Sequence, residues 1–275
     1  MANISFANLD QAFTMEDASM LVLQSVSTST STEFDYLSTS GHMHYTSGTG
    51  ITAPSSGPET GTLSEWLIDL DNDNSAAPEI AITNINLPYA DLMIGVAGAA
   101  TIRGWAGMLG GADVFDFTFA DYSANVKIAG DGGDTETGVN YTGANDRFEA
   151  GASPLTGFVQ IFGDFIDISS GVTANGGDDF FQISGLIIAG DFEDVFNGGE
   201  GIGGDDTFMA TLFGSYGSVS IRGDANSVSS NGELTGGDDL IDMRNATFQS
   251  GSTVLVLSGD VESNNGTLTG GNDTI

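Results

Sequence analysis

Six aspartates occupy one position of a recurring phrase, and their residue type suits the binding of a hard metal ion. The phrase reads Gly-Gly-x-Asp-x-apolar, as in Gly-Gly-Asp-Asp-Thr-Phe at residues 203–208. Carboxylate and carbonyl oxygens beside glycines are the ligands that calcium prefers. The spacing of these aspartates is 33, 33, 27, 33 and 34 residues. The predicted calcium ligands of this set are Asp113, Asp146, Asp179, Asp206, Asp239 and Asp273.

A second set of aspartates closes the apolar runs between these phrases. Each run alternates apolar residues and ends in Gly-Asp, as in Val-Gln-Ile-Phe-Gly-Asp at residues 159–164. In the first four repeats this aspartate stands 15 residues before the next Gly-Gly-x-Asp aspartate. The second set is Asp131, Asp164, Asp191, Asp224 and Asp260. Acids directly before members of the first set, namely Asp178, Asp205 and Asp238, are additional candidate ligands.

Short strands and tight turns must position these fixed points. The 275 residues include 40 glycines and 5 prolines, with Val, Ile, Phe and Thr in short runs, a composition that favours strands over helices. A period near 33 residues without a helical segment indicates a stacked β architecture. We therefore predict an all-β protein: a parallel β-solenoid of β-roll or β-helix type, about 33 residues per coil, over residues 96–275. Residues 1–95 lack the repeat, and we expect a mostly β cap or assembly region there, with a helix at Phe6–Ala18 and a second short one opening at Leu87–Leu92.

Stacked coils would place equivalent aspartates in columns. Carboxylates about 5 Å apart repel by roughly 3 kcal/mol at an effective dielectric constant near 20. The chain has 38 acidic residues and 5 basic ones, for a net charge of −33, so it contains few cations to offset the repulsion. Several bound calcium ions would offset it. Exposed, hydrated aspartates in ordinary Gly-Asp turns are the simpler alternative.

The same charge indicates which partners the chain would avoid. A strongly acidic surface disfavours nucleic acid and anionic membranes. The longest early apolar run, Met20–Leu23, is too short for a secretory leader or a membrane span, so membrane insertion is not expected. Cysteine is absent, which rules out disulfides and thiolate metal sites in this chain.

At the Gly-Gly-x-Asp phrases the chain resembles the repeats-in-toxin family of secreted bacterial calcium-binding proteins. The family phrase is Gly-Gly-x-Gly-x-Asp-x-apolar-x, and residues 270–275 look like that phrase shortened by two residues. The resemblance covers residues 110–275 and departs from the family in period, because family repeats follow one another about every nine residues. It implies calcium binding and type I secretion to the cell surface or the extracellular space.

Two weaker patterns lie in the first ninety residues. Asp69, Asp71 and Asp73 have the alternating acids of a calcium loop, but Asn74 replaces the glycine of an EF-hand and Ile80 its glutamate. The three aspartates therefore predict a calcium site of looser geometry than an EF-hand. His42 and His44 would share one face of a strand, as a zinc or copper pair does, although exposed histidines are the commoner explanation.

Enzymatic activity is not expected. Polysaccharide lyases and epimerases also use parallel β-helices, and paired carboxylates can act as acid and base. Cleavage of a uronate, however, requires a cluster of basic side chains around the substrate. The five scattered cations, Arg103, Lys127, Arg147, Arg222 and Arg244, cannot be assigned to one.

These observations together predict a secreted, calcium-binding structural protein of the cell surface or extracellular matrix, of biofilm or surface-layer type. The phrase at residues 270–275 opens another coil, which favours head-to-tail self-assembly into filaments when calcium is bound. The alternatives are a calcium-dependent module that binds acidic polysaccharide and, less favoured, a β-helix polysaccharide lyase or epimerase.

Overall fold

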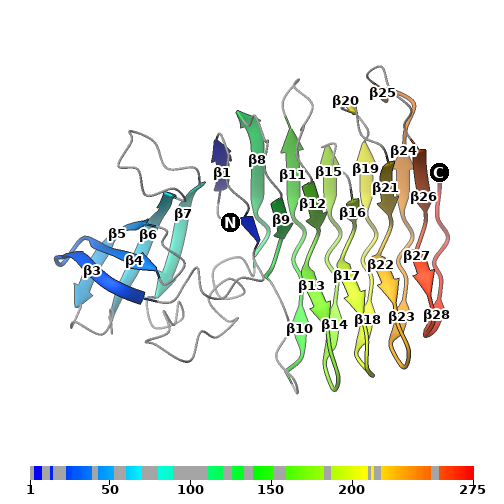
Figure 1. Ribbon diagram of the computed structural model, residues 1–275, viewed down its shortest axis with the longest axis horizontal. Coiled ribbons are helices and arrows are strands. Elements are labelled where there is room, and N and C mark those ends of the chain that lie inside the picture. The colour runs from blue at the N-terminus through cyan, green and yellow to red at the C-terminus, as the bar shows by residue number, and fades with distance from the viewer. Residues whose placement is uncertain are drawn as a thin grey trace.

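The protein is all β in the computed structural model. The structure describes residues 3–7, 13–14, 23–38, 43–52, 60–69, 80–88, 111–119, 126–132, 139–150, 159–182, 187–209, 212–213, 218–248 and 254–275. Among these residues there is no helix, and hence none that could cross a membrane. Parallel sheets are stacked as a β-solenoid, with equivalent strands roughly 33 residues apart, which confirms the predicted fold class (Figure 1).

Each coil passes through four sheets, named A to D, in the order B, C, D and A. Sheet A contains β8 (Val114–Phe119), β11 (Arg147–Ala150), β15 (Phe180–Gln182), β19 (Thr207–Met209) and β24 (Leu240–Asp242). Sheet B contains β9 (Val126–Ala129), β12 (Val159–Phe162), β16 (Ile187–Ala189), β21 (Ser218–Arg222) and β26 (Val254–Ser258). Sheet C contains β13 (Phe165–Ile168), β17 (Phe192–Val195), β22 (Ala225–Val228) and β27 (Val261–Asn264). Sheet D contains β10 (Tyr141–Thr142), β14 (Thr173–Asn175), β18 (Glu200–Ile202), β23 (Glu233–Thr235) and β28 (Thr267–Thr269).

The register of these sheets is constant although the repeat length varies. Arg147 pairs with Phe180, 33 residues later, and Phe180 pairs with Thr207, only 27 residues later. The short repeat loses its residues between sheets A and B, where a pair of short strands, β20 (Leu212–Phe213) and β25 (Thr247–Phe248), occurs in later coils. Length changes therefore fall outside the two Asp-bearing corners of the coil.

The N-terminal strands continue the solenoid sheets. β1 (Asn3–Ala7) pairs parallel with β8, and β2 (Phe13–Thr14) pairs parallel with β9, so these strands cover the first repeat strands of sheets A and B. β7 (Ile80–Pro88) pairs antiparallel with β1. An antiparallel meander follows, made of β6 (Thr60–Asp69), β5 (Met43–Thr52), β4 (Phe34–Ser38) and β3 (Leu23–Ser29), and gives sheet A eleven strands.

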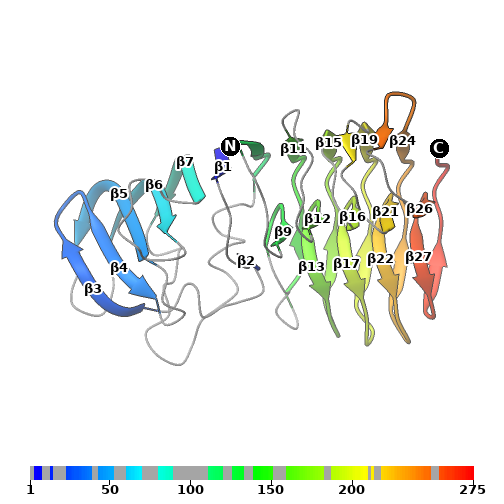
Figure 2. The same ribbon diagram turned by 45° about the horizontal axis from the view of Figure 1, so that its top comes forward.

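The helix expected at Phe6–Ala18 is wrong. The described residues of that segment lie in β1 and β2. β1 pairs with β7 on one side and with β8 on the other. These pairings satisfy the backbone groups of β1 and override a weak local helical pattern. The meander lies at the opposite end of the molecule from the last repeat in both views (Figure 2).

The interior of the coils is divided into two apolar compartments. Between sheets A and B, the rings of Phe115, Phe148, Phe181 and Phe208 stack with centroids 4.6, 4.8 and 4.7 Å apart. Between sheets C and D lies a separate cluster of Phe165, Ile168, Val172, Ala174, Phe192, Val195, Ala225, Val228 and Leu234. The Gly-Asp phrases form the corner between sheets B and C, and the Gly-Gly-x-Asp phrases form the corner between sheets D and A. These two corners meet between the compartments, and we call this constriction the waist. In Figure 1 sheets C and D form the lower part of each coil.

Candidate metal centre

The aspartates of the Gly-Gly-x-Asp phrases form a buried row along the solenoid axis, which we call the anchor row. In each step the backbone N–H of one anchor aspartate donates to Oδ1 of the equivalent aspartate in the next coil. The distances are 2.6 Å from Asp113 to Asp146, 2.6 Å from Asp146 to Asp179, 2.6 Å from Asp179 to Asp206, 2.8 Å from Asp206 to Asp239 and 3.1 Å from Asp239 to Asp273. Each side chain thus ties its own coil to the preceding one.

The aspartates of the Gly-Asp phrases form a second row, the crossing row, whose side chains span the waist. Each accepts a hydrogen bond from a backbone N–H at the opposite corner of its own coil. The distances are 2.6 Å from Ala144 to Asp131, 2.9 Å from Gly177 to Asp164, 3.1 Å from Gly204 to Asp191, 2.7 Å from Gly237 to Asp224 and 2.9 Å from Gly271 to Asp260. The two rows together are called the aspartate seam.

Much of the seam is removed from water yet lacks hydrogen-bond donors. Asp164, Asp191 and Asp224 are 0 % exposed, and Asp206 is 1 % exposed. One carboxylate oxygen of each of seven seam aspartates has no hydrogen-bond partner: Asp131, Asp146, Asp164, Asp179, Asp206, Asp224 and Asp239. Burial of an uncompensated carboxylate costs several kcal/mol. The seam therefore requires protons or cations to neutralise it.

The pKa values of the seam carboxyls reflect this environment. Burial raises the pKa of Asp131 to about 7 and that of Asp239 to about 7. Burial, with repulsion from Asp131 and Asp179, raises the pKa of Asp146 to about 11. Burial also raises the pKa of Asp224 to about 10. Burial raises the pKa values of the most enclosed members well above the usual range: Asp164, Asp179, Asp191 and Asp206.

The protein itself supplies no cation to the seam from its described residues. Lys127 pairs with Glu193, and Arg222 pairs with Glu262 on the outer side of sheets B and C. Arg147 pairs with Glu149, and Arg244 with Asp242, on the outer side of sheet A. Each Lys or Arg side chain in the described part of the chain is thus paired with an acid outside the seam.

Whether the seam can hold a metal ion depends on the oxygen ligands that it offers. Among the described residues, no three acidic or histidine side chains converge on one point as a preformed metal site. Any ion in the seam would therefore draw on pairs of carboxylates and complete its shell with backbone carbonyls, which are acceptable calcium ligands. Carbonyl oxygens are close: Oδ2 of Asp206 and the carbonyl oxygen of Gly223 both lie within 1.8 Å of the place where a Gly190 Cβ would stand. The donor chemistry fits a hard cation.

Glycines at the Gly-Asp corner make this close approach possible. A Cβ on Gly190 would stand 1.7 Å from Oδ2 of Asp206 and 1.8 Å from the carbonyl oxygen of Gly223. The same clash with a carboxylate and a carbonyl recurs at the equivalent positions Gly130, Gly163 and Gly223, and at Gly259 the clash is with the Asp273 side chain. The glycine of each Gly-Asp phrase is therefore required by the contact between corners of adjacent coils.

We expect Gly190→Ala to lower the free energy of unfolding of the calcium-loaded protein by about 3 kcal/mol or more, because backbone and a buried carboxylate must move. Gly111→Ala is the matched control, since a Cβ there meets nothing within 4 Å. Thermal unfolding followed by circular dichroism measures both variants. Equal melting temperatures for the two would contradict the close packing at the waist.

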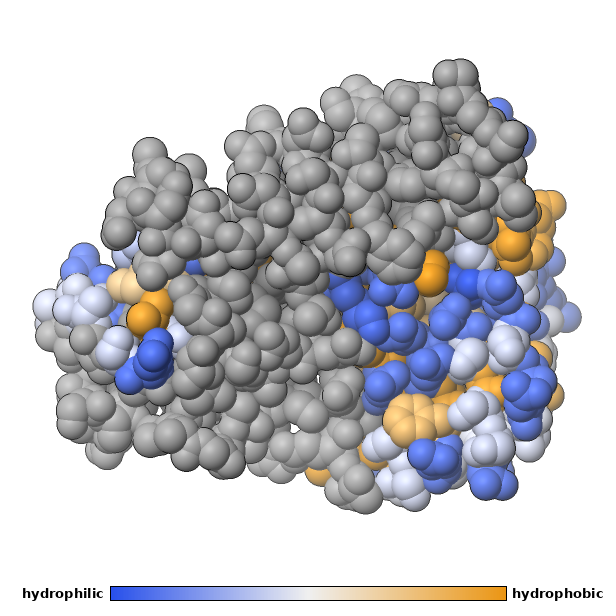
Figure 3. Space-filling view, viewed as in Figure 1, coloured by the Kyte–Doolittle hydropathy of each residue, from blue (hydrophilic) through white to orange (hydrophobic). Residues whose placement is uncertain are grey.

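The third group of predicted ligands lies outside the seam. Asp178, Asp205 and Asp238 are exposed and form an outer row on the corner between sheets D and A. Oδ1 of Asp178 accepts the N–H of Asp205 at 3.1 Å, and Oδ1 of Asp205 accepts that of Asp238 at 2.8 Å. Hydrophilic residues cover much of the described surface of the repeats on the face seen in Figure 3. These side chains face water, unlike their immediate neighbours in the anchor row.

The weaker N-terminal patterns are not part of the seam. Asp69 is buried at the end of β6, whereas Asp71 and Asp73 lie outside the described residues. His44 is also buried, contrary to the expectation of exposure, and its Nδ1 accepts the indole N–H of Trp66 at 3.0 Å. His42, its proposed partner, lies outside the described residues.

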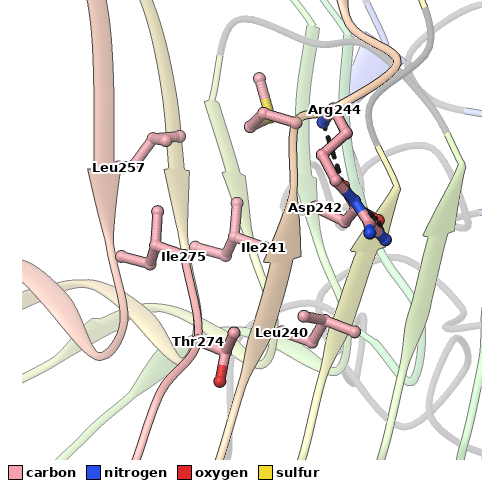
Figure 4. Close-up of a pocket in the computed structure, with 8 residues that line it drawn as sticks. Leu240, Ile241, Asp242, Arg244, Leu257, Thr274 and Ile275 are labelled. Atoms are coloured by element: carbon pink, nitrogen blue, oxygen red, sulfur yellow. Dashed lines mark hydrogen bonds and ion pairs between the residues drawn. The ribbon is translucent and has the colours of Figure 1, made fainter.

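An apolar cavity of about 570 Å³ lies between β24 and β26 (Figure 4). Ile241, Leu257 and Ile275 line it, and Arg244 at its edge bonds to Asp242. The cavity includes no seam aspartate, and its one carboxylate is already paired with Arg244.

The sequence predicts both rows of aspartates in the seam, but it does not predict which backbone N–H groups each carboxylate accepts. The recurrence of the Gly-Asp phrase once in each repeat predicts a column, whereas the reach of Asp164 across the waist to Gly177 depends on how the coil folds back. The buried guanidinium of Arg222, 3 % exposed, was also missed. The alternation of Val-Ser-Ile-Arg at residues 219–222 places it on the outer face of β21, opposite Ile221.

Comparison of the chain with protein-family models, with curated proteins and with solved structures finds no match.

Proposed function

We propose that this chain is a calcium-binding structural protein whose solenoid is stabilised by ions in the aspartate seam. The observation that carries the proposal is the set of buried carboxylate oxygens without hydrogen-bond partners, in a part of the chain where every described Lys and Arg is paired elsewhere. Ions between carboxylates would remove both the repulsion within the seam and the cost of leaving these oxygens unsatisfied.

Calcium is the cation that best matches the seam. Its donors are carboxylate and carbonyl oxygens, and neither thiolates nor histidines lie beside them in the described residues. Calcium accepts irregular shells of six to eight oxygens, whereas magnesium requires a near-ideal octahedron. Protons are the competing neutralising agent, because the raised pKa values allow several carboxyls to stay protonated near neutral pH.

The setting we propose is the cell surface or the extracellular matrix, after type I secretion. Calcium-binding modules outside the cell have dissociation constants on the order of 10⁻⁴ to 10⁻³ M, so their folding follows the calcium concentration around them. A chain with net charge −33 and an unneutralised seam would remain poorly folded where calcium is scarce. Calcium would then limit the completed fold to the exterior.

Self-association is a second element of the proposal. Leu240, Leu255 and Ile275 are among the exposed large apolar residues, and all three lie at the end of the repeats away from the meander. Burial of these side chains against another copy would remove apolar surface from water. Because β1 already covers β8, a head-to-tail contact through sheet A would pair β24 with the opposite edge strand of that sheet, β3.

Isothermal titration calorimetry of the calcium-free protein at pH 7 tests the proposal. We expect calcium to bind with a dissociation constant on the order of 10⁻⁴ M and magnesium to bind far more weakly. The heat of binding should change with the ionisation enthalpy of the buffer, because carboxyls such as Asp131 release protons. Light scattering on the same samples tests assembly. Absence of calcium binding up to about 10 mM, well above the range of extracellular modules, would contradict the proposed function.

A further inference from the structure

We propose that the seam is a clasp: cation binding holds the part of each coil formed by sheets C and D, here called the C/D lobe, closed against sheets A and B. Loss of the cation then opens the C/D lobe first, while the N-terminal meander stays folded. This inference rests on the proposed function and adds to it where in the fold the ion acts.

The path of the chain supports a clasp. A coil enters the C/D lobe through its Gly-Asp corner and leaves it through its Gly-Gly-x-Asp corner, so the lobe is closed where these corners meet. In the coil of Asp164, that contact includes the bond of 2.9 Å from the N–H of Gly177 to Oδ2 of Asp164. The equivalent bonds at Asp131, Asp191, Asp224 and Asp260 repeat it in the other coils.

The charges of the seam act in the direction that opens this contact. Asp146 of the anchor row is repelled by Asp131 of the crossing row, which lies on the other side of the waist. The pairs Asp164 with Asp179 and Asp206 with Asp191 repeat this repulsion across the waist in later coils. Without a cation, these carboxyls face one another across the waist with one oxygen each unpaired, and the backbone-to-carboxylate bonds hold the two corners together.

The described apolar interior of the C/D lobe is smaller than that of the part of each coil formed by sheets A and B. Its cluster contains nine buried residues, two of them alanines. Sheet A, in contrast, has the stack of four phenylalanines on its inner face and continues without a break into β1 and the meander. Regions with few buried apolar contacts open at the lowest free energy.

Hydrogen exchange read by mass spectrometry, on the full chain at pH 8 with calcium and after its removal, tests the clasp. We expect amide exchange in β13, β17, β22, β14, β18 and β23 to accelerate at least about tenfold more than exchange in β11, β15 and β19. Exchange in β5, β6 and β7 should stay within about twofold of its rate with calcium.

Calorimetry on the same sample separates failure of the clasp from failure of the proposed function. If calcium binds and all four sheets lose protection equally, or if sheet A loses protection first, the clasp is overturned while calcium binding stands. If calcium does not bind and no segment responds, both ideas are wrong. Asp178→Asn is the matched control variant, because this exposed carboxylate is outside the seam and its loss should leave the exchange pattern unchanged.

Discussion

Removal of calcium at pH 8 is expected to lower the melting temperature of the repeats by at least about 10 °C, and transfer of the calcium-free protein to pH 5 is expected to restore much of it. The folded-state pKa values of the seam carboxyls are raised above the ordinary value of 3.8, to about 7 for Asp131 and Asp239 and to about 10 for Asp224. A raised pKa means that the folded state binds more protons than the unfolded chain. Its contribution to stability is therefore present at low pH and lost as the pH rises through the folded values.

Calcium removes this dependence of stability on pH, because it replaces protons as the neutralising charge. The calcium-loaded protein should melt at a similar temperature at pH 5 and at pH 8, so the stabilisation by calcium is largest at pH 8. Thermal unfolding followed by circular dichroism, on protein dialysed free of calcium and on protein saturated with it, gives the four values needed. A calcium-free protein that is equally stable at pH 8 and pH 5 would show that the seam carboxylates are not buried as described.

Asp179→Asn is expected to raise the melting temperature of the calcium-free protein at pH 8 by about 5–10 °C, because it removes a carboxyl whose raised pKa destabilises the calcium-free fold as the pH rises. Asparagine retains the Oδ1 that accepts the N–H of Asp146, now at 2.6 Å. Its amide group replaces the Oδ2 that has no donor and that lies beside the carbonyl oxygen of Gly190. The amide can donate a hydrogen bond there, so the variant replaces an unpaired carboxyl oxygen with a neutral group that is paired.

The same substitution should weaken the response to calcium, because a ligand charge is lost in the middle of the seam. The matched control is the neighbouring residue: Asp178→Asn changes the net charge equally, but its carboxylate is exposed in the outer row. We expect the control to shift the melting temperature by no more than about 2 °C, as exposed carboxylates do. If the two variants behave alike, net charge and not the buried seam governs the response to calcium.

The sequence predicts the solenoid because its period and its strand-like composition agree. Equivalent residues such as Phe148 and Phe181 pair in register, as a stacked coil requires. The two rows of aspartates are predicted for the same reason, since a position that recurs once in every repeat becomes a row along the axis. Neither result needs knowledge of how one coil folds back on itself.

The waist could not be predicted, because it depends on contacts between corners about 15 residues apart in one coil. Asp178 and Asp179 are both acids of the same phrase, and their roles differ only because adjacent residues point to opposite sides of the corner. The strands β1 and β2 were missed for another reason. They carry no glycine phrase, and only their pairing with β8 and β9 makes them part of the solenoid.

The 27-residue coil shows that the solenoid separates two kinds of sequence change. Six residues are missing between Asp179 and Asp191, relative to the coil before, yet Ile161 still pairs with Ile188 and the waist contacts recur. The connection between sheets A and B can therefore diverge in length and composition without disturbing the row of carboxylates. In evolutionary terms, this side of the solenoid is free to acquire new surfaces while the carboxylate rows stay in place.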